Sequence, residues 1–247
     1  MNNDFKKQLI SIIGAKNLLL NDWEKKPFSN GWRYGTGTAL AVVKPGNLIE
    51  LWKVLELCVK NDLIIIMQAA NTGLTGGSTP YGNNYDREVI IINTLRIDKI
   101  HLLNNGNEIL ALAGSTLYDL EKKLLPLGRE PHSVIGSTSI GASIVGGVCN
   151  NSGGSLVKRG PAYTEMSLYA KIDKNGKLLL INDLDIDLGK SPEEILYNLE
   201  NECFGKKDFL KSKKISSNET YEKLVRNINS TKPARFNSDP KLLYGAS

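Results

Sequence analysis

The sequence lacks the features by which several large classes of protein are recognised. Its 247 residues include three cysteines at irregular spacing and without a CxxC pair, so they indicate neither a disulfide framework nor a zinc site. No apolar run approaches the roughly 18 residues of a membrane span. The polar N-terminus, MNNDFKKQLISIIG, is not typical of a secretion signal. The expected compartment is therefore the cytoplasm.

Familiar catalytic and nucleotide-binding motifs are missing as well. The chain has no GxxxxGKS/T loop, no GxGxxG before a helix, no GxSxG elbow and no HExxH helix. Its two histidines, His101 and His132, leave few groups that could act as a general base. The residues alone therefore identify no catalytic group and no metal ligands.

Charge is ordinary in amount but uneven in position. The net charge is +5, and residues 205–247 hold ten basic against four acidic side chains, whereas the rest of the chain is nearly balanced. A basic tail can bind an anionic membrane surface, although a solvated, partly disordered segment is the commoner explanation. Because aromatic residues are not interleaved with the basic ones, no nucleic acid is expected as a partner.

Two helices are predicted in the first part of the chain. Apolar residues at helical spacing indicate a helix over 5–13 that ends at Gly14. Asn47 and Glu50 form a near capping box, which begins a second helix that runs to about Asn61.

Three apolar runs around the second helix predict a parallel sheet. They are ALAVVKP at 39–45, LIIIMQAA at 63–70 and VIIINT at 89–94. A strand, a helix and another strand with continuous apolar character indicate a right-handed crossover between parallel strands that are covered on both faces.

The middle of the chain has a different pattern. Asn105-Gly106 and the turn at 174–176 each separate two short apolar runs, as in antiparallel hairpins. Ser115 is the expected cap of a helix that ends near Gly128, and Ser191 the expected cap of another. The change from parallel to antiparallel patterns predicts two lobes that meet near residues 95–105.

Two glycine-rich segments carry no acidic or basic side chain apart from one histidine. The first is QAANTGLTGGSTPYG at 68–82, directly after an apolar run, and the second is HSVIGSTSIGASIVGGVCNNSGG at 132–154. Exposed backbone N–H groups in such segments can hold a phosphate or diphosphate without a lysine. The alternative is that both are close-packed turns inside a glycine-rich core.

The same segments resemble a known family. QAANTGLTGGSTP, ALAVVKPGNLIELWKVLELCV and GREPHSVIGSTSIGASIVGGVCNNSGGSLVKRGPAYTEM are similar to the FAD-binding part of the bacterial quinone-dependent D-lactate dehydrogenases, which belong to the vanillyl-alcohol oxidase and p-cresol methylhydroxylase flavoprotein superfamily. The resemblance covers about residues 5–240. It implies an α+β fold, a two-lobed FAD-binding domain of the p-cresol methylhydroxylase type with a small parallel α/β lobe and a larger, mostly antiparallel lobe.

The resemblance also implies where FAD binds. In this superfamily, main-chain N–H groups of the loop after a parallel strand hold the diphosphate, and the second glycine-rich segment lines the flavin and the rest of the dinucleotide. The matching cofactor-binding residues are Ala69, Ala70, Asn71, Thr72, Gly73, Gly77 and Ser78 in the first segment, and Gly136, Ser143 and Gly153 in the second.

Several other residues near these segments are weaker candidates. They are His132 beside the flavin ring, Asn150 and Asn151 at its edge, and Arg129 and Arg159 facing a substrate anion or the phosphates. An ordinary loop hydrogen bond or surface ion pair explains each of them at least as well. A covalent flavin link at Cys149 has no support beyond the two glycines before it.

The implied domain plan is a first lobe at 1–100, a second lobe at 101–204 and a basic tail at 205–247 that leads to an absent substrate-binding cap domain. The implied partners are D-lactate or a related 2-hydroxy acid and a membrane quinone, with the protein peripheral on the cytoplasmic face of the inner membrane. Because family members continue well beyond LLYGAS, we expect the cofactor half of a dehydrogenase, whose independent turnover is in doubt. The alternative function is a non-catalytic FAD-binding remnant or interaction module.

Overall fold

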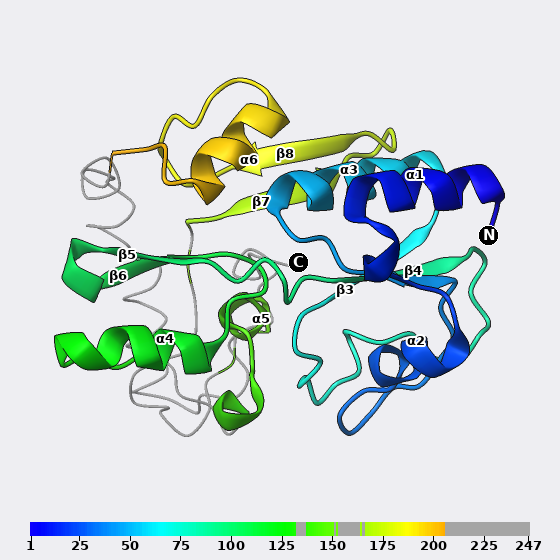
Figure 1. Cartoon of the computed structure of the whole chain (residues 1–247), viewed down its shortest axis with the longest axis horizontal. Helices are drawn as coiled ribbons and strands as arrows, with labels where there is room; N and C mark the ends of the chain where they lie inside the picture. Colours follow the sequence, from blue (N-terminus) through cyan, green and yellow to red (C-terminus); the bar gives the residue numbers. More distant parts are fainter. Residues whose placement is uncertain (132–136, 151, 153–163, 165, 206–247) are drawn as a thin grey trace.

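The chain folds into two groups of elements, which are shown in the computed structural model of Figure 1. The structure describes residues 1–131, 137–150, 152, 164 and 166–205. The first group consists of α1 (Asn3–Ile13), η1 (Ala15–Asn17), β1 (Leu18–Leu19), α2 (Asp22–Ser29), β2 (Ala41–Val43), α3 (Leu48–Lys60), β3 (Ile64–Gln68) and β4 (Val89–Asn93). The second group consists of β5 (Ile100–Leu103), η2 (Asn104–Gly106), β6 (Glu108–Ala111), α4 (Leu117–Leu124), η3 (Leu125–Leu127), η4 (Thr138–Ile140), α5 (Ile144–Cys149), β7 (Leu168–Ile172), β8 (Leu178–Asn182) and α6 (Pro192–Glu200).

The first group is built on a four-stranded sheet of order β1-β2-β4-β3. Strands β2, β4 and β3 are parallel, and the short β1 pairs with β2 in the antiparallel direction. All five residues of β4 are buried, because α1 and α3 cover one face of the sheet and α2 covers the other (Figure 1). The predicted parallel α/β arrangement is confirmed, although β2 is shorter than the run 39–45.

The predicted starts of α3 and α6 are confirmed by their hydrogen bonds, whereas α1 begins at Asn3, before the predicted range 5–13. At α3, Oδ1 of Asn47 accepts from the N–H of Glu50 at 2.8 Å, and the Glu50 carboxylate accepts from the N–H of Gly46 at 2.6 Å. At α6, Oγ of Ser191 accepts from the N–H of Glu194 at 3.2 Å. These contacts span at most four residues, which is why the sequence pattern reveals them.

The predicted cap of α4 is wrong by one residue. Thr116, not Ser115, precedes the helix, and its Oγ1 accepts from the N–H of Asp119 at 3.1 Å. The Ser115 side chain is completely buried and donates its hydroxyl to the carbonyl oxygen of Leu112 at 2.6 Å. Because that hydroxyl closes the turn after β6, the next hydroxyl residue caps the helix.

The second group contains the two predicted hairpins, β5–β6 and β7–β8, which are both antiparallel. They form separate two-stranded sheets in the described part of the chain, with α4 packed on the first and α6 near the second (Figure 1). In the β7–β8 turn, the Asp173 carboxylate accepts from the N–H groups of Lys177 and Asn175. These bonds favour the charged form and lower the pKa of Asp173.

Helix α3 joins the cores of the two groups. Val54 and Cys58 pack with α1 and with β2 and β4 of the sheet, whereas Leu48 and Trp52 pack with β5, β8 and α6 of the second group. One helix therefore buries two faces, which accounts for the nine apolar residues among its thirteen.

Candidate cofactor-binding site

Strands β3 and β4 end in polar residues that fix the first glycine-rich segment. Gln68 lies opposite Asn93 in the parallel register, and both are buried. The Gln68 side-chain amide donates to the carbonyl oxygens of Phe28 and Ser78, each at 2.8 Å. Asn93 donates to the carbonyl oxygen of Ala69 at 2.9 Å. The two amides thus hold both ends of the loop at the carboxyl edge of the sheet, where α/β sheets bind ligands.

Side chains inside the loop hold its shape. Asn71 adopts the left-handed conformation, with φ of 55°. Its side-chain nitrogen donates to the carbonyl oxygen of Asn30 at 2.8 Å, and its side-chain oxygen accepts from the Ser78 hydroxyl at 2.9 Å. Asn71 and Ser78 therefore use their polar side-chain groups to close the loop.

The backbone N–H groups of residues 70–78 donate no hydrogen bond within the part of the chain that the structure describes. A Cβ atom added at Gly77 would meet nothing within 4 Å, and one added at Gly73 would meet only the Ser78 hydroxyl oxygen at 3.9 Å. Protein packing therefore does not require glycine at these two positions. A row of unpaired donors beside glycines fits a ligand that carries negative charge and approaches the backbone closely.

The described part of the second segment is connected to this loop by an unbroken series of contacts. The Thr94 hydroxyl donates towards the carbonyl oxygens of Gln68 and Ala113, at 3.3 and 3.2 Å. Two residues after Ala113, the carbonyl oxygen of Ser115 accepts from the N–H of Ile144, which is the first residue of α5. The carboxyl end of β3 and the start of α5 are thus held in one region (Figure 1).

Among the expected site residues of the second segment, the structure describes Ser143, whereas Gly136 and Gly153 lie outside the described residues. Ser143 is buried and precedes α5, and its Oγ accepts from the N–H of Gly146 at 3.1 Å. Its hydroxyl oxygen therefore already has a helix-capping partner.

The weaker candidates have other roles where the structure describes them. Arg129 packs against Gly106 in the turn between β5 and β6, away from the first segment. The Asn150 side chain donates to the carbonyl oxygen of Gly146 at 2.8 Å and so closes the end of α5. His132, Asn151 and Arg159 lie outside the described residues.

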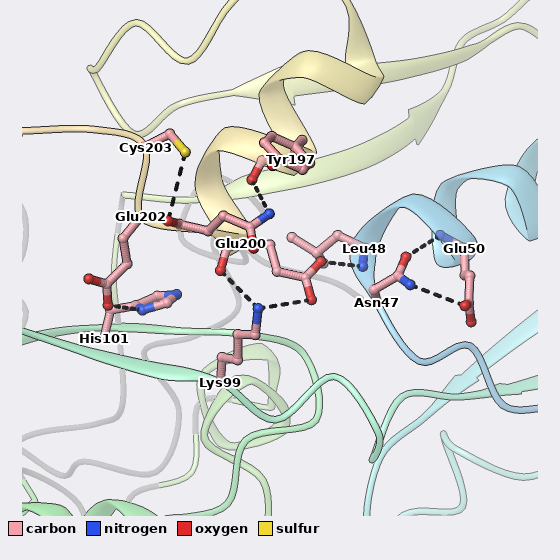
Figure 2. Close-up of polar contacts among 10 residues, drawn as sticks. Asn47, Leu48, Glu50, Lys99, His101, Tyr197, Glu200, Glu202 and Cys203 are labelled. Carbon is pink, nitrogen blue, oxygen red and sulfur yellow. Dashed lines mark hydrogen bonds and ion pairs between the residues drawn. The ribbon is translucent and has the colours of Figure 1, made fainter.

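His101 belongs to a separate cluster, on β5. Figure 2 shows its Nδ1 against the carboxylate of Glu202, while its Nε2 is buried and has no hydrogen-bond partner among the residues that the structure describes. Among the described residues, no three His, Cys, Asp or Glu side chains are placed to hold a metal ion. The hydrogen bonds described above, which hold the first segment, do not include His101.

A parallel strand followed by an uncharged loop with available backbone N–H groups is typical of a nucleotide-binding α+β domain, and this is the class of protein that the fold and the loop indicate. The chain belongs to the FAD-binding domain family, whose model matches residues 39–180. The family assigns FAD as the cofactor of the fold, and the unpaired amides and open glycines of the first segment fit a dinucleotide.

Curated relatives cover the whole chain. It is 54% identical over 246 residues to the quinone-dependent D-lactate dehydrogenase of Escherichia coli (strain K12), and 52% identical over 240 residues to that of Haemophilus influenzae. These alignments include 100% and 97% of this chain but 43% of each relative. The chain therefore spans less than half the length of these relatives, and the resemblance found in the sequence is confirmed.

Solved structures agree on the fold. p-Cresol methylhydroxylase superposes with a TM-score of 0.55 at 14% identity, covering 72% of this chain and 35% of the other. Alkyldihydroxyacetonephosphate synthase gives a TM-score of 0.61 at 16% identity, covering 69% and 34%. The expected α+β fold of the p-cresol methylhydroxylase type is confirmed.

Within the described residues, none of the helices has the length and apolar character needed to span a bilayer.

Proposed function

We propose that this chain is the FAD-binding part of an enzyme that oxidises D-lactate to pyruvate and passes the electrons to a quinone. The proposal is supported by the relatives named quinone-dependent D-lactate dehydrogenase, which align with the chain over almost its full length. It is also supported by the FAD-binding family, to which the chain belongs.

In this proposal the first segment holds the FAD diphosphate, and the second lines the flavin. The binding residues are Ala69, Ala70, Asn71, Thr72, Gly73, Gly77 and Ser78 around the diphosphate, with Gly136, Ser143 and Gly153 along the flavin and the rest of the dinucleotide. At Asn71 and Ser78 the groups that bind FAD are those of the backbone, because the two side chains bond to each other and the Asn71 side chain also bonds to Asn30.

The observation that carries the proposal is the row of backbone N–H groups at 70–78 that have no partner in the described part of the chain. A diphosphate brings concentrated negative charge, and several peptide dipoles aimed at it can replace a lysine or arginine. Charged side chains in the loop would hold the backbone away from the phosphates. The absence of charge from residues 68–82 follows from this geometry.

Bound FAD would supply the two-electron redox chemistry that converts a 2-hydroxy acid into a 2-oxo acid. The contribution of this chain is to bind and orient the dinucleotide. The proposed location is cytoplasmic and peripheral, at the cytoplasmic face of the inner membrane, where the quinone lies. There the excess of basic residues in 205–247 would favour an anionic membrane surface.

Substitution at Gly77 tests the diphosphate site. Gly77→Val adds a branched side chain where the protein leaves open space, so we expect unchanged thermal stability of the apoprotein. The affinity for FAD, measured by calorimetric titration, is expected to fall at least tenfold, which corresponds to about 1.4 kcal/mol. The matched control is Gly176→Asn in the β7–β8 turn, where φ is 77° and asparagine is tolerated.

The control should bind FAD as the wild type does. Equal FAD affinity in Gly77→Val and the wild type would contradict the proposed site, and a folded wild type that binds no FAD would contradict the proposed function. D-Lactate-dependent reduction of a dye by the FAD-loaded chain separates an active enzyme from a non-catalytic FAD-binding module.

A further inference from the structure

Exposed aromatic side chains gather beside the first glycine-rich segment. Tyr34 and Tyr81 are 58% and 69% exposed, and the neighbouring Trp32 is 61% exposed. Large apolar rings in water are unfavourable, and an exposed cluster of them marks a binding surface more often than a single exposed ring does.

The two tyrosines are carried by irregular segments, 31–38 and 79–82, that are fastened together by backbone hydrogen bonds. The N–H of Gly82 donates to the carbonyl oxygen of Thr36 at 2.7 Å, and the N–H of Thr38 donates to the carbonyl oxygen of Gly82 at 3.0 Å. A Cβ atom at Gly35 would overlap the Thr79 side chain, so the segments approach closely only because this residue is glycine. The backbone that carries the two rings is thus held by contacts within the protein.

The tyrosine pair adjoins the diphosphate loop directly. A Cβ atom added at Gly76 would lie 3.1 Å from Cδ1 of Tyr34, so the Tyr34 ring lies against the backbone of the loop. The rings of Tyr34 and Tyr81 are nearly parallel, with 19° between their planes and 6.1 Å between their centroids. Figure 1 shows the two segments on the α2 side of the loop, opposite α5.

We propose that Tyr34 and Tyr81 form a stacking platform for the adenine of FAD. The inference rests on the proposed function, because it takes the diphosphate to lie on residues 70–78. In FAD the diphosphate joins two ring systems that leave it at opposite ends. If the flavin extends towards α5 and the second segment, the adenosine extends towards the side that carries the exposed rings.

The chemistry of the pair suits a nucleobase. Adenine has a flat, neutral π-face, and stacking on an aromatic side chain is sequence-independent and strong enough to matter for affinity. The pKa of Tyr34 is raised, mainly by a hydrogen bond with Tyr81. The Tyr34 hydroxyl is therefore neutral near pH 7. An uncharged platform adds no repulsion towards the phosphates nearby.

A comparison of FAD with FMN tests this inference, because FMN carries the flavin and one phosphate but no adenosine. The variants are Tyr34→Ala, Tyr81→Ala and the double variant, together with Tyr34→Phe, which keeps the ring. Tyr197→Ala, an exposed tyrosine on α6, is the control. Dissociation constants for FAD and FMN are measured on the full 247-residue chain, and circular dichroism checks that each variant is folded.

We expect the double variant to bind FAD at least tenfold more weakly than the wild type, a change of about 1.4 kcal/mol. FMN affinity should not change, and both Tyr34→Phe and the control should resemble the wild type. Equal losses for FAD and FMN would overturn the inference, since the rings would then serve the flavin or the loop. Unchanged affinities for both FAD and FMN would overturn it as well. A wild type that binds no FAD would overturn the proposed function as well, which distinguishes the two failures.

Discussion

The carboxylate of Glu200 makes a contact between the two groups of elements whose energy can be worked out from the structure. Figure 2 shows Glu200, at the end of α6, reaching the start of α3. Its Oε2 accepts from the N–H of Leu48 at 2.8 Å, and its Oε1 lies 3.6 Å from Nζ of Lys99. The residue is 8% exposed, so the bond to the helix terminus is shielded from water.

Replacement of this carboxylate should destabilise the protein by about 2–4 kcal/mol. A buried hydrogen bond to a charged group contributes about 1.5–3 kcal/mol. The ion pair adds up to about 1 kcal/mol, because the Lys99 side chain is half exposed. For a chain of this size, such a loss lowers the melting temperature by roughly 4–16 °C.

Thermal unfolding followed by circular dichroism measures this effect. Glu200→Ala should show the full decrease, whereas Glu200→Gln should lose about 1 kcal/mol, because it keeps the acceptor oxygen but not the charge. Glu193→Ala, which removes an exposed carboxylate from the first turn of α6, is the control and should cost less than about 1 kcal/mol. If Glu200→Ala melts at the same temperature as Glu193→Ala, the contact does not stabilise the fold as argued.

Three further predictions concern Gly114 and Cys58, which lie inside the fold. Gly114→Ala should destabilise the chain by roughly 1–3 kcal/mol in denaturant unfolding, because its Cβ would overlap the carbonyl oxygen of Thr94. Burial raises the pKa of the Cys58 thiol from its ordinary value of 9.0 to about 12. Since the folded pKa is the higher one, the stability that the neutral thiol contributes is intact below about pH 9 and is lost as the pH rises towards 12, at up to about 1.4 kcal/mol per pH unit. The unfolding free energy of the wild type should therefore fall relative to that of Cys58→Ala between pH 9 and 10.5, and a constant difference would contradict this. In the folded protein Cys58 should also resist a thiol reagent that modifies the exposed Cys203.

Local sequence patterns predict most of the regular elements, because the interactions that define them span few residues. The caps at Asn47 and Ser191 and both hairpin turns are examples. The error at Ser115 arises from a choice between two adjacent hydroxyl groups. That choice is decided by the turn after β6, whose geometry a helix pattern does not contain.

The candidate site is only partly visible in the sequence. An uncharged glycine-rich loop after an apolar strand indicates backbone donors, and the backbone N–H groups of residues 70–78 have no partner among the described residues. The amides that fix this loop, Gln68 and Asn93, were missed, although each is a polar residue at the end of a strongly apolar strand, and that was the available signal. The contact of Glu200 with Leu48 joins residues 152 positions apart, which no local pattern can predict.

The platform of Tyr34 and Tyr81 depends on irregular backbone. Neither helical nor strand periodicity describes residues 31–38, and the approach of the two segments is set by close packing at Gly35 against Thr79. Such packing follows from tertiary structure, so the sequence gives glycines and aromatic residues here without indicating that they meet.

Backbone amide resonances of the isotopically labelled chain, followed while FAD is added, test most directly whether residues 70–78 bind the diphosphate. We predict one bound FAD per chain, with the largest changes in chemical shift at the amides of residues 70–78. Uptake of FAD that leaves these amide resonances where they are in the apoprotein would contradict the claim that the loop backbone binds the diphosphate.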